Sequence, residues 1–358
     1  MSAVTIKQSA RLRAVSYLNV LLCLLVVFIH VSSHPVSTLD KKSLAFALVY
    51  IPWRFSSFAV PGFIFLGGLR TFLKPPDQNG WRAFYLGRAR RVFLPYLVWS
   101  VVYYTYFVLR GFDTLSLSRF AYGLATATIF GPFYFIIVIS QFYLLTPLWK
   151  RVTERVSPKI AVPVAVVATP LFYLNFPYLL RAINPSWDFM YTDRLFLTYL
   201  AYFVIGCYAG SRYEAFVQCI RRRLGALAAA FLLLCALDIG LGWAVYTGRL
   251  AFPLLEYVHY LYCLSAVAFL MAAFSAHEGK LPCPRLLRAV DEVSFSIYLL
   301  HGLIIYLCNE WMAYLGIRRI GAQYALRTVF VYTATIALCV GFRALSRRLI
   351  GRKRSAAP

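Results

Sequence analysis

About ten stretches of the chain are apolar and long enough to cross the roughly 30 Å hydrocarbon core of a bilayer as helices. Their approximate limits are 14–33, 52–70, 92–109, 133–149, 160–180, 195–211, 224–245, 256–276, 293–314 and 324–344. A segment in lipid must satisfy its own backbone N–H and C=O groups, so spans of this kind form helices. Since 61% of the 358 residues are apolar, far more than a soluble domain needs, we predict an all-α polytopic membrane protein.

Along the chain, connecting segments rich in basic residues alternate with connecting segments that have few. The chain has 37 Lys and Arg against 13 Asp and Glu, and every second connection holds most of the basic residues. This alternation follows the positive-inside rule, under which Lys and Arg gather in cytoplasmic loops. It predicts that both termini are cytoplasmic, with an N-terminal tail over 1–13 and a basic C-terminal tail over 346–358. Because the charge is dispersed among apolar runs, we expect no nucleic-acid binding.

Nothing in the sequence divides the chain into separate domains. It has no internal repeat, low-complexity tract or Ser/Gly linker, so we predict one membrane domain over 1–358. Segment 110–132 is a connection that contains a helical apolar stretch. A Gly-Pro pair ends helices, so we expect an interfacial helix on the extracytoplasmic side that stops at Gly131-Pro132, before the fourth span.

The eight cysteines lie mostly inside apolar runs, without the spacing of a metal site or a disulfide framework. His30 and His34 are one helical turn apart, but two ligands without a third do not make a zinc site, so no metal is expected. Cys23 lies on the same helix face as His30 and is a candidate acyl carrier. No cation nearby in the sequence would lower the pKa of its thiol.

Polar residues inside the first span form a stripe. Asn19 and His30 are eleven residues apart, which at 100° per residue places them within about 20° of one direction and about 16 Å apart along the axis. Ionisable groups inside spans are costly and indicate function. Two interpretations remain open. The pair either packs helices, with the imidazole reaching toward the headgroups, or lines a path from the cytoplasmic half of the membrane to its outer edge.

Acidic and imidazole side chains also fall toward the predicted outer ends of later spans. Glu256 and His259 lie one turn apart and can touch. His301 shares a face of the ninth span with Ser294 and Tyr298, and Glu310 ends that span. The candidate residues for binding a substrate on this side are Asp188, Asp193, His259 and His301.

The densest basic stretch, L-G-R-A-R-R-V-F-L-P-Y over 86–96, leads into the third span on the predicted cytoplasmic side. Arg88 and Arg91 are three residues apart and share a helix face, a spacing that suits phosphate recognition by two guanidinium groups. Contact with anionic membrane lipids explains the same stretch equally well. We therefore predict an anionic ligand here, either a phosphorylated substrate or a lipid.

Several motifs, taken in order along the chain, resemble one family. They are V-V-F-I-H ending at His30, F-A-V-P-G-F-I-F-L-G-G-L over 58–69, R-A-R-R-V-F-L-P-Y with Arg88 and Arg91, F-Y-F-I-I-V-I-S-Q-F-Y-L-L-T-P-L over 133–148, Y-F-V-I-G-C-Y-A-G over 202–210 and S-F-S-I-Y-L-L-H over 294–301. Each motif is largely apolar, so the specificity lies in the ordered set. The chain resembles the membrane acyltransferase-3 family, ten-helix enzymes that acylate cell-envelope glycans.

The resemblance implies a reaction that uses both sides of the bacterial inner membrane. A cytoplasmic acyl-coenzyme A, with acetyl the expected acyl group, would donate to a hydroxyl of an envelope glycan or lipid-linked sugar outside. Arg88 and Arg91 would bind the phosphates of the coenzyme, and His30 would take the hydroxyl proton as general base. Glu256 or Glu310 is our candidate for the carboxylate that orients His30. Acyl-coenzyme A is then a substrate, and no permanently bound cofactor is expected.

One position departs from the family pattern. Members usually have an arginine eleven residues before the first-helix histidine, where this chain has Asn19. An amide can hydrogen-bond the carbonyl or amide of a donor but cannot neutralise charge. Either Asn19 contacts the donor in a weaker version of that role, or Arg11 or Arg13 supplies the charge from one or two turns below. The alternatives from other classes are an exporter of a polysaccharide or small molecule, and a non-catalytic partner of glycan synthesis or export machinery.

Overall fold

The computed structural model describes residues 13–187, 189–277 and 283–355, with side chains described as far as residue 349. Every regular element in these ranges is a helix, which confirms the all-α prediction. The chain divides into two compact units: one comprises the residues up to Val60 and those from Ile220 onward, and the other comprises Pro61–Cys219. Both units are helical, and the prediction of one membrane domain over 1–358 stays a prediction.

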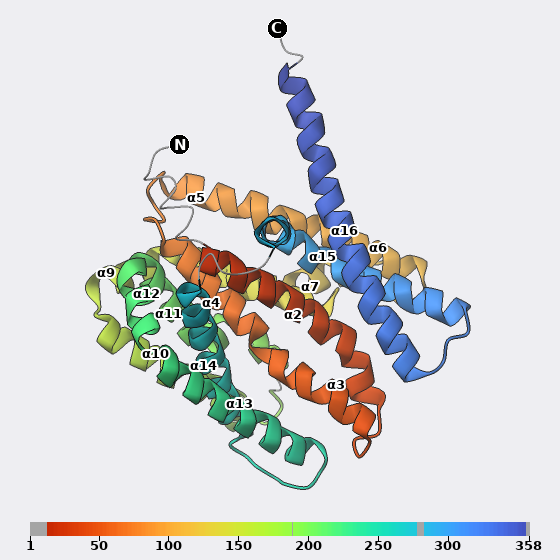
Figure 1. The fold of residues 1–358 in the computed structure, drawn as a ribbon, viewed down its shortest axis with the longest axis horizontal. Helices are drawn as coiled ribbons and strands as arrows, with labels where there is room; N and C mark the ends of the chain where they lie inside the picture. The colour runs from red at the N-terminus through yellow and green to blue at the C-terminus, as the bar shows by residue number, and fades with distance from the viewer. Residues whose placement is uncertain (1–12, 188, 278–282, 356–358) are drawn as a thin grey trace. The chain divides into compact units, whose positions relative to one another are not determined.

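The first unit consists of long helices from the two ends of the chain (Figure 1). They are α2 (Arg13–Thr38), α3 (Leu44–Phe55) with the short 3-10 turn η1 (Ser56–Phe58), α13 (Leu224–Tyr246), α14 (Leu255–Ala276), α15 (Pro284–Tyr314) and α16 (Ile320–Ser355). α2 packs against α3, α14, α15 and α16, and α13 packs against α14 and α3. The N-terminal helix is therefore the element around which this unit is assembled.

The second unit contains shorter and more interrupted helices. They are α4 (Ala59–Phe72), α5 (Trp81–Arg88), the π-helical turn η2 (Ala89–Phe93), α6 (Leu94–Leu109), α7 (Leu117–Thr126), η3 (Gly131–Phe133), α8 (Tyr134–Leu144), α9 (Thr146–Arg155), α10 (Pro158–Ile183), η4 (Thr192–Arg194), η5 (Phe196–Tyr199), α11 (Leu200–Ser211) and α12 (Tyr213–Arg222). α10 packs against α11, and α11 also contacts α9.

Within the described ranges, eight helices are long and apolar enough to cross a membrane. They are Arg13–Thr38, Leu44–Phe72, Trp81–Leu109, Pro158–Ile183, Leu224–Tyr246, Leu255–Ala276, Pro284–Tyr314 and Ile320–Leu349. α7 and Gly131–Leu144 make a ninth span if taken together, although they are bent by 54°, and Phe196–Ser211 is a shorter apolar helix. Each predicted segment thus corresponds to a helical element, and the polytopic membrane class is confirmed. The side on which each terminus lies stays a prediction.

The helix predicted within 110–132 is present but ends earlier than expected. α7 stops at Thr126 because Ala127 adopts a left-handed conformation (φ 53°). The N–H groups of Ala127 and Thr128 both return to the Gly123 carbonyl, a hydrogen-bonding pattern that closes helix C-termini. The expectation that Gly131-Pro132 ends this helix is therefore wrong. Pro132 instead lies near the start of the short turn Gly131–Phe133 that leads into α8, where its fixed φ suits a helix start.

α2 and α15 run parallel and in a nearly constant register. The residue numbers of their contacting pairs differ by 271 to 275: Ser16 and Asn19 with Asp291, Asn19 and Cys23 with Ser294, and His30 with His301. α16 runs antiparallel to α2, because Tyr332 donates to the Leu24 carbonyl while Tyr324 meets Ser32 further along. The first predicted span is thus covered by the last two, and its polar stripe faces α15.

In the second unit, α4 and α11 cross at glycines. A Cβ added to Gly206 would collide with the Phe65 carbonyl, and one added to Gly210 would collide with the Leu69 carbonyl. Only glycine allows two helix backbones to approach so closely, which is why small residues four apart favour tight helix packing in membranes. The apolar motifs over 58–69 and 202–210 therefore meet through direct contact between their backbones.

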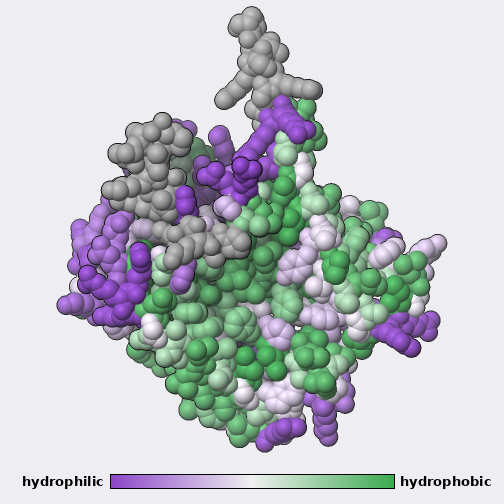
Figure 2. All heavy atoms as spheres, viewed as in Figure 1, coloured by the Kyte–Doolittle hydropathy of each residue, from purple (hydrophilic) through white to green (hydrophobic). Residues whose placement is uncertain are grey.

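Large apolar side chains are exposed on many helices. Examples from five of them are Leu44, Val98, Val164, Leu232 and Phe342. In Figure 2, hydrophobic side chains cover much of the viewed face, while hydrophilic ones gather near the end of α16. A helical protein with an apolar exterior satisfies its backbone internally and presents these side chains to lipid.

Candidate functional site

A polar group lies near the N-terminal ends of α2 and α15. The side-chain amide of Asn19 donates to Asp291 Oδ1 (2.7 Å) and to Ser294 Oγ (2.9 Å), and Ser16 Oγ donates to Asp291 Oδ2 (2.8 Å). Asn19 is only 2% exposed. Both N–H groups of its amide are therefore engaged by α15. The ionisable group at this level is the carboxyl of Asp291, which was not among the predicted site residues.

About 16 Å further along α2, His30 meets His301 of α15. The ring centroids are 5.2 Å apart, with the ring planes tilted by 35°. His301 is fully buried, and its Nδ1 lies 2.7 Å from the carbonyl oxygen of Tyr298. Because a carbonyl only accepts, Nδ1 carries the proton, and Nε2 of neutral His301 carries the lone pair. We call this line of polar side chains, comprising Ser16, Asn19, His30, Asp291, Ser294 and His301, the α2/α15 seam.

The two carboxylates proposed to orient His30 lie on the helices of the same unit. Glu310 comes nine residues after His301 on α15, about 14 Å along the helix axis. Glu256 lies in the first turn of α14 and is exposed. His30 contacts the imidazole of His301. That a carboxylate orients His30 stays a prediction.

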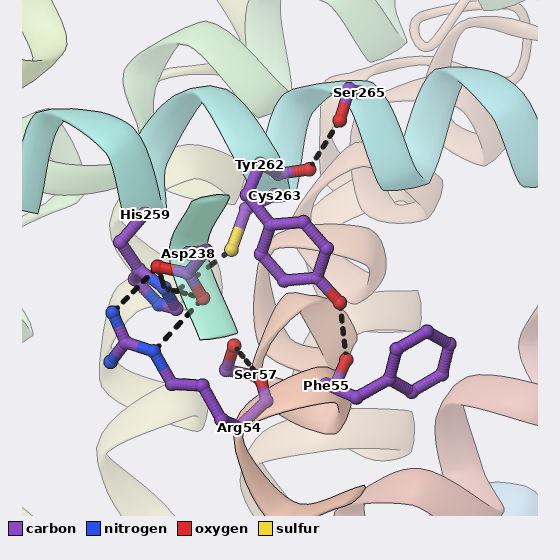
Figure 3. Close-up of polar contacts among 8 residues, drawn as sticks. All are labelled: Arg54, Phe55, Ser57, Asp238, His259, Tyr262, Cys263 and Ser265. Atoms are coloured by element: carbon purple, nitrogen blue, oxygen red, sulfur yellow. Dashed lines mark hydrogen bonds and ion pairs between the residues drawn. The ribbon is translucent and has the colours of Figure 1, made fainter. Parts of the chain in front are cut away.

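A second polar cluster joins α3, α13 and α14 (Figure 3). Arg54 holds Asp238 through two hydrogen bonds, from Nε to Oδ2 at 2.9 Å and from Nη2 to Oδ1 at 2.7 Å. His259 Nδ1 lies 3.1 Å from both carboxylate oxygens, and its Nε2 lies 3.7 Å from Cys263 Sγ. Asp238 is fully buried. The partner of His259 is therefore Asp238, although the sequence suggested Glu256, and we call these four residues the Asp238 cluster.

The basic entry to α6 contains a π-helical turn. Arg88 Nη2 donates to Thr71 Oγ1 (3.0 Å), and its guanidinium lies over the rings of Tyr143 (4.2 Å) and Phe84 (5.1 Å). Arg91 is exposed. Arg88 is thus fixed in place by its surroundings. The shared face predicted for the two arginines assumed α-helical spacing, which the wider turn over Ala89–Phe93 alters.

Of the acidic residues predicted near the sixth span, Asp193 is described within the second unit. It is half-buried in η4, with Oδ1 3.8 Å from Arg194 Nε, and burial raises the pKa of its carboxyl. Arg194 also donates to the Thr126 carbonyl and lies over the ring of Tyr191 at 4.3 Å. Asp188 lies outside the described residues.

Among the residues that the structure describes, no group of three or more His, Cys, Asp or Glu side chains could hold a metal ion. The Asp238 cluster illustrates why. His259 directs one ring nitrogen to Asp238 and the other to Cys263, so these ligand atoms do not converge on one point.

Comparison with known proteins identifies the family. The family model described as an acyltransferase domain matches residues 12–344. The chain belongs to the acyltransferase-3 family. This acyltransferase is 24% identical over 289 residues to the Bacillus subtilis (strain 168) protein named "Putative membrane-bound acyltransferase YfiQ", an alignment that covers 78% of this chain and 77% of that protein. No solved structure matches it.

Family membership confirms the resemblance carried by the ordered motifs, and it favours acyl transfer over export as the activity. Three ionisable residues of the two polar regions were nevertheless missed from the sequence: Arg54, Asp238 and Asp291. Each lies inside a helix long enough to span a membrane. An ionisable side chain in such a helix needs a partner, and that signal could have found all three.

Proposed function

We propose that this acyltransferase moves an acyl group, acetyl in the simplest case, from cytoplasmic acyl-coenzyme A to a hydroxyl of an envelope glycan or lipid-linked sugar on the outer side of the bacterial inner membrane. Family membership supports acyl transfer. The observation that carries the rest of the proposal is the His30–His301 pair. An imidazole inside a span can accept a proton near neutral pH, as transfer to a hydroxyl requires.

The two histidines differ in exposure, which suggests their roles. His30 is half-buried, whereas His301 is fully buried, so His30 is the imidazole that an acceptor hydroxyl would contact. His301 donates from Nδ1 to the Tyr298 carbonyl, so in the neutral ring its Nε2 would accept an N–H of His30 when the two rings turn toward each other. His30 would then present its other nitrogen to the hydroxyl as the general base. His301 would take the orienting role that a carboxylate has in a catalytic triad.

The donor is proposed to reach His30 along the α2/α15 seam. The pantetheine arm of coenzyme A is about 15–20 Å long, close to the roughly 16 Å between Asn19 and His30. Asp291 and the side-chain carbonyl of Asn19 are acceptors of the kind that the amide N–H groups of pantetheine need. The thioester would then lie near His30, and the thiolate of the coenzyme, a good leaving group, needs no dedicated acid.

The phosphates of the coenzyme are proposed to bind Arg88 and Arg91. Thr71 takes one of the five N–H donors of the Arg88 guanidinium, and the rings of Tyr143 and Phe84 fix its plane. A guanidinium held in this way loses little side-chain entropy when it binds phosphate. Arg91, exposed three residues later, would add a second charge.

The transmembrane orientation in this proposal has its own test. Lys41 follows α2 and Arg249 follows α13, and both are exposed. We expect Lys41→Cys and Arg249→Cys to react in intact cells with a thiol reagent that does not cross the inner membrane. Protection of both positions would invert the orientation and place the acceptor in the cytoplasm.

Analysis of envelope glycans in a deletion strain tests the activity. We expect the polymer to persist at normal length and amount, with its ester-linked acyl groups lost. Restoring the wild-type gene should restore the esters. Loss of the polymer itself would instead support the exporter alternative or a role as a partner of glycan synthesis machinery. Purified protein with labelled acetyl-coenzyme A and the de-esterified glycan then tests the donor directly.

A further inference from the structure

The Asp238 cluster contains a thiol, an imidazole and a carboxylate connected in series (Figure 3). His259 and Cys263 are four residues apart on α14, so one helix sets their geometry, with Nε2 3.7 Å from Sγ. Asp238 lies on α13, and each of its carboxylate oxygens is 3.1 Å from the other ring nitrogen of His259, Nδ1. Arg54 then fixes the carboxylate from α3. The thiol, imidazole and carboxylate therefore follow the order of the nucleophile, general base and orienting carboxylate in a catalytic triad.

The hydrogen bonds determine which way protons can move in this series. The carboxylate of Asp238, paired with Arg54, only accepts, so His259 carries a proton on Nδ1. In the neutral ring the lone pair is then on Nε2, the atom that faces Cys263 Sγ. The imidazole is thus in the tautomer that can take the thiol proton.

Cys23 provides an internal comparison, since it is also a buried thiol in the same unit. Its Sγ donates to the backbone carbonyl of Ser294 at 3.6 Å. A carbonyl oxygen does not take a proton at neutral pH, whereas an imidazole does. Of these two thiols, Cys263 is the one whose partner can generate a thiolate.

The surroundings of Cys263 suit a thioester. Cys263 is 2% exposed and lies within the apolar span Leu255–Ala276, beside the fully buried Tyr262. A thioester formed in such surroundings is protected from hydrolysis because water is excluded. The most exposed side chains of the cluster are those of His259 and Arg54, which are 20% and 13% accessible.

We propose that Cys263 accepts the acyl group from the donor as a thioester before it passes to the hydroxyl, an inference that rests on the proposed acyl-coenzyme A donor. The Cys263 thiolate attacks the carbonyl carbon of the donor thioester after His259 Nε2 has taken the thiol proton. The carbon–sulfur bond to the coenzyme breaks, and the departing coenzyme thiolate takes that proton. In the second step the acceptor hydroxyl attacks the carbonyl carbon of the Cys263 thioester and loses its proton to a histidine base. The carbon–sulfur bond to Cys263 breaks, and the histidine gives the proton to the Cys263 thiolate.

Rapid-quench labelling of the full-length protein in detergent tests the proposal. The protein is mixed with acetyl-coenzyme A labelled in the acetyl group, without acceptor, and is denatured in acid within milliseconds to seconds. We expect covalent label on a peptide from α14 that neutral hydroxylamine removes, as it removes thioesters. Acceptor added before the quench should discharge the label.

Three variants and one control make the assignment specific. Cys263→Ala should carry no label, and Cys263→Ser should carry label that resists neutral hydroxylamine, because an oxygen ester replaces the thioester. His259→Gln should acquire label roughly 10²–10⁴-fold more slowly, the range for losing a general base. Cys235→Ala, which removes a half-buried thiol from the neighbouring helix α13, should label as the wild type does. Each variant is first checked for a monodisperse profile in detergent.

The outcomes separate this proposal from the activity on which it rests. Full transfer by a folded Cys263→Ala protein, with no label on wild-type Cys263, would overturn the thioester and leave direct transfer to the hydroxyl intact. Failure of the wild type to use acetyl-coenzyme A at all, in labelling and in transfer, would overturn the proposed donor and the thioester with it. Label on Cys263 that acceptor discharges would establish both steps.

Discussion

The two polar regions of the first unit hold their histidines in different ways. In the α2/α15 seam, His30 faces the imidazole of His301, and the carboxyl of Asp291 lies about 15 Å away along α15. In the Asp238 cluster, His259 has a carboxylate on one ring nitrogen and the Cys263 thiol on the other. One region spreads its polar groups along a helix pair, and the other gathers them at one point.

This difference indicates what each region can do. Polar groups spread over a length of about 16 Å suit a long, flexible donor that must pass from one side of the membrane toward the other. In the Asp238 cluster, a thiol, an imidazole and a carboxylate in direct contact suit a covalent step. The alternative is that the buried ion pair between Arg54 and Asp238 anchors three helices. The following variants separate these interpretations, beginning with the largest expected effect.

His30→Gln should nearly abolish transfer to the acceptor, by roughly 10²–10⁴-fold, because glutamine keeps shape and hydrogen bonding but cannot accept a proton near neutral pH. Protein yield and donor binding should stay normal. His34→Gln, one turn further along α2 at an exposed position, is the matched control and should keep activity. A folded and fully active His30→Gln protein would show that the seam only packs helices.

Asp238→Ala should destabilise the protein by about 3–5 kcal/mol, because it leaves the Arg54 guanidinium without its carboxylate in a mostly buried position. The free energy of unfolding in mixed detergent measures this loss. In the matched double variant Arg54→Leu with Asp238→Leu, no unpaired charge remains, and most of the stability should return. An Asp238→Ala protein as stable as the wild type would remove the anchoring role and leave the cluster a catalytic one alone.

Asn19→Ala should cost about 1.5–3 kcal/mol of stability, since it removes hydrogen bonds to the carboxyl group of Asp291 and to Ser294. Asn19→Arg, which restores the residue usual in the family, should fold, because a guanidinium at this position faces Asp291 rather than lipid. The same unfolding measurement compares the two. Misfolding of Asn19→Arg together with normal stability of Asn19→Ala would contradict the geometry of the seam.

The half-buried pair Asp77–Lys150 should show the smallest effect and contrasts with the more deeply buried pair Arg54–Asp238. A hydrogen bond from Lys150 Nζ (2.9 Å) lowers the pKa of the Asp77 carboxyl. A lowered folded pKa contributes stability above the unfolded value, near 3.8, that is lost as the pH falls through the folded value. Lys150→Met should therefore flatten the dependence of the unfolding midpoint on pH below about 4, with little change at pH 7. An unaltered acid profile would contradict this assignment.

Much of the fold could be predicted from the sequence because its signals are local. Each apolar run became a helical element, and the stripe that joins Asn19 to His30 follows from helical periodicity alone. The end of α7 was misplaced because the left-handed conformation of Ala127, rather than the Gly131-Pro132 pair, terminates it. No residue preference marks alanine for that conformation, so the sequence carries no sign of it.

The sequence by itself determined the class of protein, the approximate spans, the ordered family motifs and the candidate role of His30. The tertiary structure decided which side chains meet. His259 was expected beside Glu256 on its own helix, yet its partner is Asp238, which another helix supplies from 21 residues away. Likewise, Asn19 and His30 face residues of α15 more than 270 positions later. Helical spacing fixes neighbours within one helix, whereas contacts between helices depend on packing that no single segment encodes.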